Sequence, residues 1–210
     1  MELKIKTFPL IANENCGLKC LKVIFSYHKV NPDNFYELLS KSQRLSSRVW
    51  ITDLGKIALC CGFKVSIFSY SNRVFKPEWL LIEESRFKKL LTQQKTAYTP
   101  VNQARHSVLN FIEAGGNFYR EIAIPALFKY YLKKRCPLII AVSSRIIHRK
   151  PMKGGHFIIV NGYNGENFVI LNPQRRIVKR EIIHQNRLFS ALYQWGSWVM
   201  VLEKNKKFLS

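Results

Sequence analysis

Residues 154–173 read GGHFIIVNGYNGENFVILNP, and this stretch decides the fold. Its run Phe157–Val160 is continuously apolar, as in a buried strand, and leads into Asn164-Gly165, a dipeptide typical of tight hairpin turns. A second apolar run then returns along the chain. The stretch therefore predicts an antiparallel hairpin with strands at His156–Tyr163 and Phe168–Leu171.

The length of the turn decides which side chains share a face of this hairpin. A two-residue loop at Asn164-Gly165 would put His156 and Asn172 on opposite faces of the sheet. An odd-numbered loop, such as Asn164-Gly165-Glu166, would place Ile158 opposite Asn172. His156 and Asn172 would then be diagonal neighbours on one face. A site that uses both side chains therefore requires the longer, bulged turn.

The rest of the chain divides into a helical part and a strand-rich part. Apolar periodicity and capping residues predict helices at Gly17–Lys29, Asp33–Lys41, Leu54–Cys61, Pro77–Gln94, Val101–Ala114, Pro125–Arg135 and Gln185–Trp195. Further strands are predicted at Phe63–Tyr70, Leu138–Ser143, Arg176–Ile182 and Ser197–Glu203. Helices first and a mostly antiparallel sheet afterwards is the α+β pattern. We expect a single domain over residues 1–210, with a helical N-terminal half packed on a mostly antiparallel C-terminal sheet.

Cys16 stands at the start of the first predicted helix, directly after Asn15, a residue that favours the cap position. Free peptide N–H groups and the helix dipole stabilise an anion at that end, so we expect a lowered pKa for the thiol. Gly17 removes side-chain bulk there and would let a substrate approach. A thiolate also needs an imidazole partner. His156 is the best partner, because Gly154-Gly155 sets it at the mouth of the sheet.

The other cysteines of the five show no pattern of a metal or redox site. No C-x-x-C pair is present, and Cys20, one helical turn after Cys16, is expected to pack in the core. An odd number of cysteines without a regular framework favours a reduced, cytosol-like setting. We therefore expect neither a bound metal nor a cofactor.

The net charge points to acidic partners. The chain has 34 Lys and Arg against 13 Asp and Glu, which gives +21. Such a field favours an acidic protein or peptide, a nucleic acid or an anionic membrane surface. A nucleic-acid partner rests on charge alone, because no RNA-binding, phosphate-loop or helix-turn-helix motif is present. A Lys-rich background composition is the alternative explanation.

Nothing in the sequence predicts a membrane segment. The first residues carry no apolar signal-peptide core, and apolar runs such as Pro137–Val142 are far too short to span a bilayer. We expect a cytoplasmic protein, the alternative being a secreted effector that is exported without a cleavable signal.

Three motifs resemble those of a known family. The stretch NCGLKCL at Asn15–Leu21 resembles the Asp-Cys-Gly-x-Ala-Cys-Leu signature of C39-like, papain-fold cysteine peptidases. The stretch GHFIIVNGY at Gly155–Tyr163, with Asn172-Pro173, is similar to that family's Gly-His-Phe-x-x-x-x-Gly-Tyr and Asp/Asn-Pro elements. VWITDL at Val49–Leu54 resembles Ile-Trp-Thr-x-Asp-Leu of the branch labelled guanylyl cyclase-like. The resemblance covers most of the chain and implies a papain-like, C39-like α+β fold.

The resemblance also implies an activity and three catalytic roles. Cys16 would be the nucleophile, His156 the general acid and base, and Asn172 the residue that orients the imidazole. The implied enzyme is a thiol hydrolase, a cysteine peptidase that cleaves a peptide or amide bond through an acyl-enzyme on Cys16.

This sequence departs from the family at the oxyanion donor. The usual Gln falls at Leu10, so the donor would be Asn13, Asn15 or the backbone N–H of Cys16. A non-catalytic module that binds a peptide or an anionic partner is therefore an alternative. Nucleotide cyclase activity is a weaker one, because the 13 acidic residues include no obvious Asp pair for metal ions.

Substrate contacts are expected at two places. Trp50, at a predicted helix start, would line the cleft. The basic segment Arg145–Lys153 leads directly into His156, so a loop there would border the cleft. Its cations Arg149 and Lys153 would favour acidic side chains or phosphates, and activity would then fall with added salt.

Overall fold

The computed structural model describes residues 1–7, 9, 14–30, 49–93, 96–149, 151, 154–173 and 177–204. The strands in these ranges are β1 (Phe63–Phe68), β2 (Asn117–Tyr119), β3 (Leu138–Ser143), β4 (Gly155–Asn164), β5 (Asn167–Pro173), β6 (Val178–His184) and β7 (Trp198–Lys204). They form a seven-stranded sheet in the order β2-β1-β7-β3-β4-β5-β6. Neighbouring strands run antiparallel, except for the parallel pair β1 and β2.

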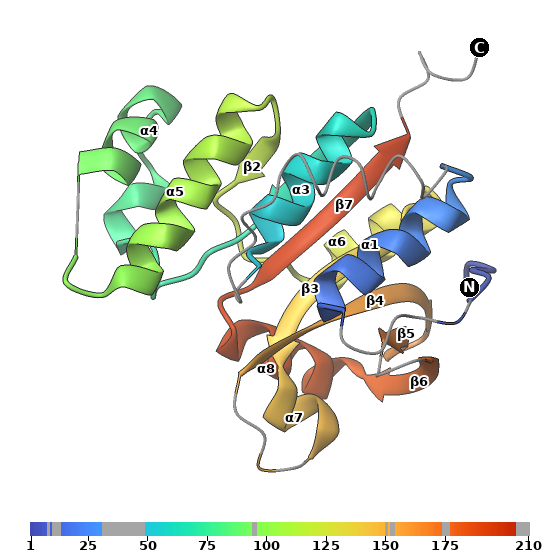
Figure 1. Cartoon of the computed structure of the whole chain (residues 1–210). Coiled ribbons are helices and arrows are strands. Elements are labelled where there is room, and N and C mark those ends of the chain that lie inside the picture. Colours follow the sequence, from blue (N-terminus) through green and yellow to red (C-terminus); the bar gives the residue numbers. More distant parts are fainter. Residues whose placement is uncertain are drawn as a thin grey trace.

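Helices cover both faces of this sheet. They are α1 (Cys16–Tyr27), α3 (Ile51–Cys60), the 3₁₀ helix η1 (Pro77–Leu80), α4 (Glu84–Gln93), α5 (Thr99–Glu113), α6 (Pro125–Lys133), α7 (Ser144–His148) and α8 (Gln185–Gln194). Figure 1 shows α1 and α3 side by side across one face. Within the described ranges, none of these helices is long and apolar enough to cross a membrane.

The central strands are apolar without alternation because each of their faces meets a separate core. In β3, which is buried along its whole length, Ile139 belongs to the same core as Leu21 of α1, whereas Ile140 belongs to the other core, with Leu188 of α8. A strand buried on both faces needs no polar positions, so its sequence is a continuous apolar run. Cys20 is fully buried in the core on the α1 face, as its position in the helix predicts.

The α+β architecture predicted from the sequence is confirmed: N-terminal helices pack on a mostly antiparallel sheet. The long helix predicted at Pro77–Gln94 is wrong, because η1 and α4 replace it. Arg120 Nη1 donates to the carbonyl oxygen of Trp79 in η1 at 2.6 Å, a tertiary contact that the local sequence pattern does not contain. Sequence analysis also missed the short elements β2 and α7. The helix predicted at Asp33–Lys41 lies outside the described residues.

The hairpin of β4 and β5 contains the extra residue that the sequence argument required, although at another place. Asn164 pairs with Asn167, so the turn has two residues, and the register shifts at a bulge between Val160 and Gly162. The predicted odd-numbered loop is therefore wrong. Its consequence is confirmed, because the pair Ile159↔Leu171 sets the register in which Ile158 lies opposite Asn172.

The N-terminal segment explains the position of this bulge. Leu3 N–H donates to the Asn161 carbonyl at 2.8 Å, and Asn161 Nδ2 donates back to the Leu3 carbonyl at 3.2 Å. Glu2 bridges Gly162, where a Cβ would lie only 2.7 Å from the Met1 carbonyl oxygen. The bulged residue is thus bonded on its free side, and glycine permits the close approach.

Candidate active site

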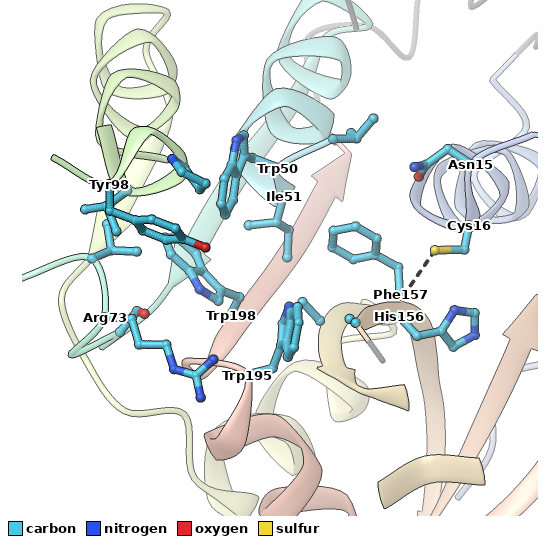
Figure 2. Close-up of a pocket in the computed structure, with 18 residues that line it drawn as sticks. Asn15, Cys16, Trp50, Ile51, Arg73, Tyr98, His156, Phe157, Trp195 and Trp198 are labelled. Atoms are coloured by element: carbon cyan, nitrogen blue, oxygen red, sulfur yellow. Dashed lines mark hydrogen bonds between the residues drawn. The ribbon is translucent and has the colours of Figure 1, made fainter. Parts of the chain in front are cut away.

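The sulfur of Cys16 lies where β4 and β5 separate. The pairs between these strands end at Ile159↔Leu171, and beyond that point Asn172 pairs only with Lys179 of β6. The N–H of Phe157 donates instead to Cys16 Sγ at 3.5 Å (Figure 2). Cys16, the first residue of α1, thereby accepts a hydrogen bond that a neighbouring strand would otherwise accept. The donor, Phe157, directly follows His156 in the chain.

Two neighbours of Cys16 fix the start of α1. Asn15 is the helix cap, and its Oδ1 accepts from Gly17 N–H at 2.8 Å. Gly17 is buried, and a Cβ there would lie 2.7 Å from Leu54 Cδ1 and 3.0 Å from Phe157 Cδ2. The expectation that Gly17 gives a substrate access is therefore wrong, because α3 and β4 already fill that space. Glycine lets the helix sit close enough to β4 for the sulfur to reach the Phe157 N–H.

His156 and Asn172 meet as the register argument predicts. His156 Nε2 lies 2.7 Å from Asn172 Oδ1 across the gap between the strands. An amide oxygen accepts only, so Nε2 carries the proton and Nδ1 keeps the lone pair. The imidazole is thus held in the tautomer that can accept a proton at Nδ1.

Glu181 fixes the orientation of Asn172, and sequence analysis missed it. The Asn172 side chain is 0% exposed, and its Nδ2 donates to Glu181 Oε1 at 3.0 Å. A carboxylate accepts only, so the amide must turn its oxygen to His156. Glu181 is on β6, two residues from Lys179, the partner of Asn172, and so lies on the same face. Its signal in the sequence is an acidic residue within the basic strand VKREIIH.

Burial decides the charge state of the pair. It raises the pKa of the Cys16 thiol, although the N–H groups of Phe157 and Gly17 act in the opposite direction. It also lowers the pKa of His156, against the Asn172 hydrogen bond and the charge of Glu181. The predicted lowered pKa for Cys16 is wrong, because desolvation outweighs the helix start. At neutral pH the resting pair is a thiol and a neutral imidazole.

A cavity of about 470 Å³ opens beside Cys16 and His156. Trp50, predicted to line the cleft, does line it. It also precedes α3, and its backbone N–H donates to Asp53 Oδ2 at 3.0 Å. Aromatic rings dominate the walls, and Figure 2 shows them between the Cys16 side and the Arg73 side. The described residues that line the cavity are Asn15, Cys16, Val49, Trp50, Ile51, Ser71, Arg73, Val74, Tyr98, Pro100, Val101, Ala141, Gly154, Gly155, His156, Phe157, Trp195 and Trp198.

The remaining predicted site residues have different positions. Asn15 lines the cavity, whereas Asn13, Leu10 and Lys153 lie outside the described residues. Arg149 is exposed at the C-terminal cap of α7 and is not among the described lining residues. The expectation of a basic loop before His156 is wrong in its first part, because Arg145–His148 belongs to α7.

Gly17→Ala tests whether close packing at Gly17 positions the sulfur. The added methyl must displace Leu54 or move α1 away from β4, and a displacement of about 1 Å costs roughly a hundredfold in rate. We expect a fall of this size in thiol-dependent turnover, with melting temperature measured alongside. Gly165→Ala is the control for a loss of stability: no atom lies within 4 Å of a Cβ there, but its φ of +58 disfavours alanine, so it should lower the melting temperature without lowering turnover. Equal activity of Gly17→Ala and the unsubstituted protein would contradict this role.

Comparison of the sequence with protein-family models and with curated proteins gives no match. Among solved structures, the chain is similar to a double glycine motif protease from an AMS/PCAT transporter, solved with the leader peptide. That likeness has 13% identity, a TM-score of 0.47 and coverage of 96% of this chain and 94% of the other. It is also similar to the peptidase domain of Streptococcus ComA, a bifunctional ABC transporter involved in a quorum sensing pathway. That likeness has 14% identity, a TM-score of 0.49 and coverage of 96% of this chain and 100% of the other.

Both TM-scores are below 0.5, and the identities are 13% and 14%. Identities this low concern the course of the chain and not its chemistry.

Proposed function

We propose that this chain is a thiol hydrolase that cleaves a peptide or amide bond through an acyl-enzyme on Cys16. One observation carries the proposal. The Cys16 sulfur is bonded to the N–H that follows His156, and the His156 ring is held through Nε2 by a buried Asn172. A thiol, an imidazole and a group that orients the imidazole are the parts that nucleophilic catalysis uses.

The neutral resting pair supports a general-base mechanism. As Cys16 Sγ attacks the substrate carbonyl carbon, its proton passes to Nδ1 of His156. The tetrahedral adduct collapses to a thioester and expels the amine, which takes that proton. A water molecule, deprotonated by His156, then attacks the thioester, and the sulfur regains a proton as the acid leaves. Glu181 favours this cycle, because its charge stabilises the imidazolium that forms in each half.

The developing oxyanion needs hydrogen-bond donors beside Cys16. The backbone N–H of Cys16 is one, at the open end of α1. Asn15 supports a second, because its Oδ1 is engaged in the helix cap and its NH₂ end is the donor end of an amide that lines the cavity. Each such donor contributes on the order of 10²–10³ in rate. Asn13 stays a prediction.

Detection of acylated Cys16 tests the function directly. Purified protein is mixed with a pool of N-acetyl peptide coumarin amides, and intact mass is recorded after rapid acid quenching. We expect coumarin release together with a mass increase equal to the acyl peptide, located on Cys16 by fragmentation. Peptides that bind while Cys16 stays unmodified and no coumarin is released would assign the chain as a binding module instead.

The pH profile of turnover checks the base. Because burial lowers the pKa of His156, the imidazole stays neutral to a lower pH than a free histidine, whose pKa is 6.5. We therefore expect the acid limb of kcat/KM to have its midpoint below pH 6.5. Measurement from pH 4 to 9 in buffers of constant ionic strength gives the midpoint. A midpoint above 6.5 would contradict a desolvated His156 as the base.

A further inference from the structure

The cavity beside Cys16 is strongly apolar and aromatic. Its described walls include rings from four separate parts of the chain and aliphatic side chains, but no carboxylate. Ligand pockets of roughly 300–1,000 Å³ are typically apolar with a few polar groups that orient the ligand. At about 470 Å³, this cavity has room for a large side chain next to the scissile bond. The aromatic lining residues are Trp50, Tyr98, Phe157, Trp195 and Trp198.

A glycine holds one of these walls in place. A Cβ at Gly155 would overlap the indole ring of Trp195, so the ring lies directly on the backbone that precedes His156. Trp195 follows α8, and Gly196 after it has φ +99, a conformation that favours glycine. The aromatic wall and the proposed base are therefore fixed by the same strand start.

Charge separates the two ends of the cavity. Figure 2 places Cys16 and His156 at one side and Arg73 and Tyr98 at the other, with indole rings between them. Among the described lining residues, Arg73 carries the single permanent charge, and it is exposed to solvent. An apolar passage that leads from the sulfur to a cation fits a substrate with an apolar group near the scissile bond and an anionic group beyond it.

We propose that the substrate is a peptide with a large apolar side chain, aromatic above all, immediately before the scissile bond, and an acidic residue two positions earlier. In an extended peptide, side chains two residues apart point to the same side, so both enter the cavity. The net charge of +21 favours the same acidic peptide from a distance. This inference rests on the proposed function for the position of the scissile bond.

Binding to the Cys16→Ala variant tests the preference without catalysis. Three of the four tryptophans line the cavity, whereas Trp79 is 2% exposed in the core, so tryptophan emission reports occupancy. Matched N-acetyl peptides carry Phe, Leu, Ala or Gly before the scissile bond, and Glu or Lys two residues earlier. We expect Kd for Phe to be at least about tenfold lower than for Ala. We expect Glu to bind about two- to fivefold more tightly than Lys, with the difference shrinking at high salt.

Matched variants connect each preference to its wall. Trp195→Ala should weaken binding of the Phe peptide, because its ring lies on Gly155 next to His156, whereas Tyr130→Ala should not, since Tyr130 is exposed but outside the lining. Arg73→Gln should remove the preference for Glu, and Arg86→Gln, an exposed cation on α4, should retain it. Equal Kd values for Phe and Gly peptides, or unchanged preferences in Trp195→Ala and Arg73→Gln, would overturn the proposal.

The two proposals fail in different ways. If Cys16→Ala binds the peptides selectively but Cys16 never becomes acylated in the unsubstituted protein, the proposed hydrolase activity is contradicted and the proposed binding preference is supported. If all peptides are cleaved with similar kcat/KM, the proposed substrate preference is contradicted and the proposed hydrolase activity is supported.

Discussion

Replacing Cys16 by alanine is expected to abolish turnover, with kcat falling by up to about 10⁶-fold, because the thioester forms on its sulfur. His156→Ala should cost nearly as much, since a buried thiol with a raised pKa needs a base to become nucleophilic. The two changes should not add in the double variant, because the residues act as one unit. Coumarin release and the mass of the acylated protein measure the loss.

The other cysteines supply the control. Cys60 is an exposed free thiol at the end of α3, so Cys60→Ala removes a reactive sulfur without touching the cavity. Its turnover should match that of the unsubstituted protein. Activity that survives in Cys16→Ala but is lost in Cys60→Ala would show that the nucleophile is Cys60 and not Cys16. Activity retained in both would exclude a cysteine nucleophile at Cys16.

The sequence predicted the site because its local patterns are strong. The helix at Gly17–Lys29 follows from its apolar face and the cap at Asn15, and the hairpin follows from two apolar runs on either side of Asn164-Gly165. The register argument linked them, since only an extra residue in the hairpin brings His156 and Asn172 to one face. The structure has that residue, at the bulge between Val160 and Gly162.

The features of the site that the sequence did not predict all depend on contacts between residues far apart in the chain. The bulge lies where the N-terminal segment bonds to Asn161, a partner more than 150 residues away that no local pattern reveals. Glu181 reaches Asn172 only through the pairing of β5 with β6. The sequence predicts cations beside the substrate at Arg149 and Lys153. Lys153 lies outside the described residues, and Arg149 is not among the described lining residues, which instead include Arg73, from a turn far earlier in the chain.

The direction of the thiol pKa was the clearest error, and its cause is general. A helix start lowers a thiol pKa only while water or other donors still solvate the sulfur. Here α1 presses Cys16 against β4, so the packing that brings it to the Phe157 N–H also desolvates it. Position along a helix can be read from sequence, but burial requires the tertiary structure.

Asn172→Ala is expected to lower kcat about a hundredfold, because the His156 ring loses the partner that fixes its tautomer and position. The change also leaves Glu181 without its amide donor, at a stability cost of about 1–3 kcal/mol. Thermal melting is measured in parallel to confirm that the variant folds. A variant with full activity would show that His156 needs no support.

Glu181→Gln separates orientation from charge. The charge of Glu181 raises the pKa of His156, so its removal lowers that pKa and shifts the acid limb of kcat/KM to lower pH. A merely structural role would leave that limb in place.

Asn172→Asp keeps an acceptor for the imidazole but sets a second carboxylate against Glu181, and we expect it to be poorly active. Combining it with Glu181→Gln reverses the hydrogen bond, since the new amide donates to the new carboxylate, and should restore turnover toward that of Glu181→Gln alone. A double variant no better than Asn172→Asp would contradict the chain from Glu181 through Asn172 to His156.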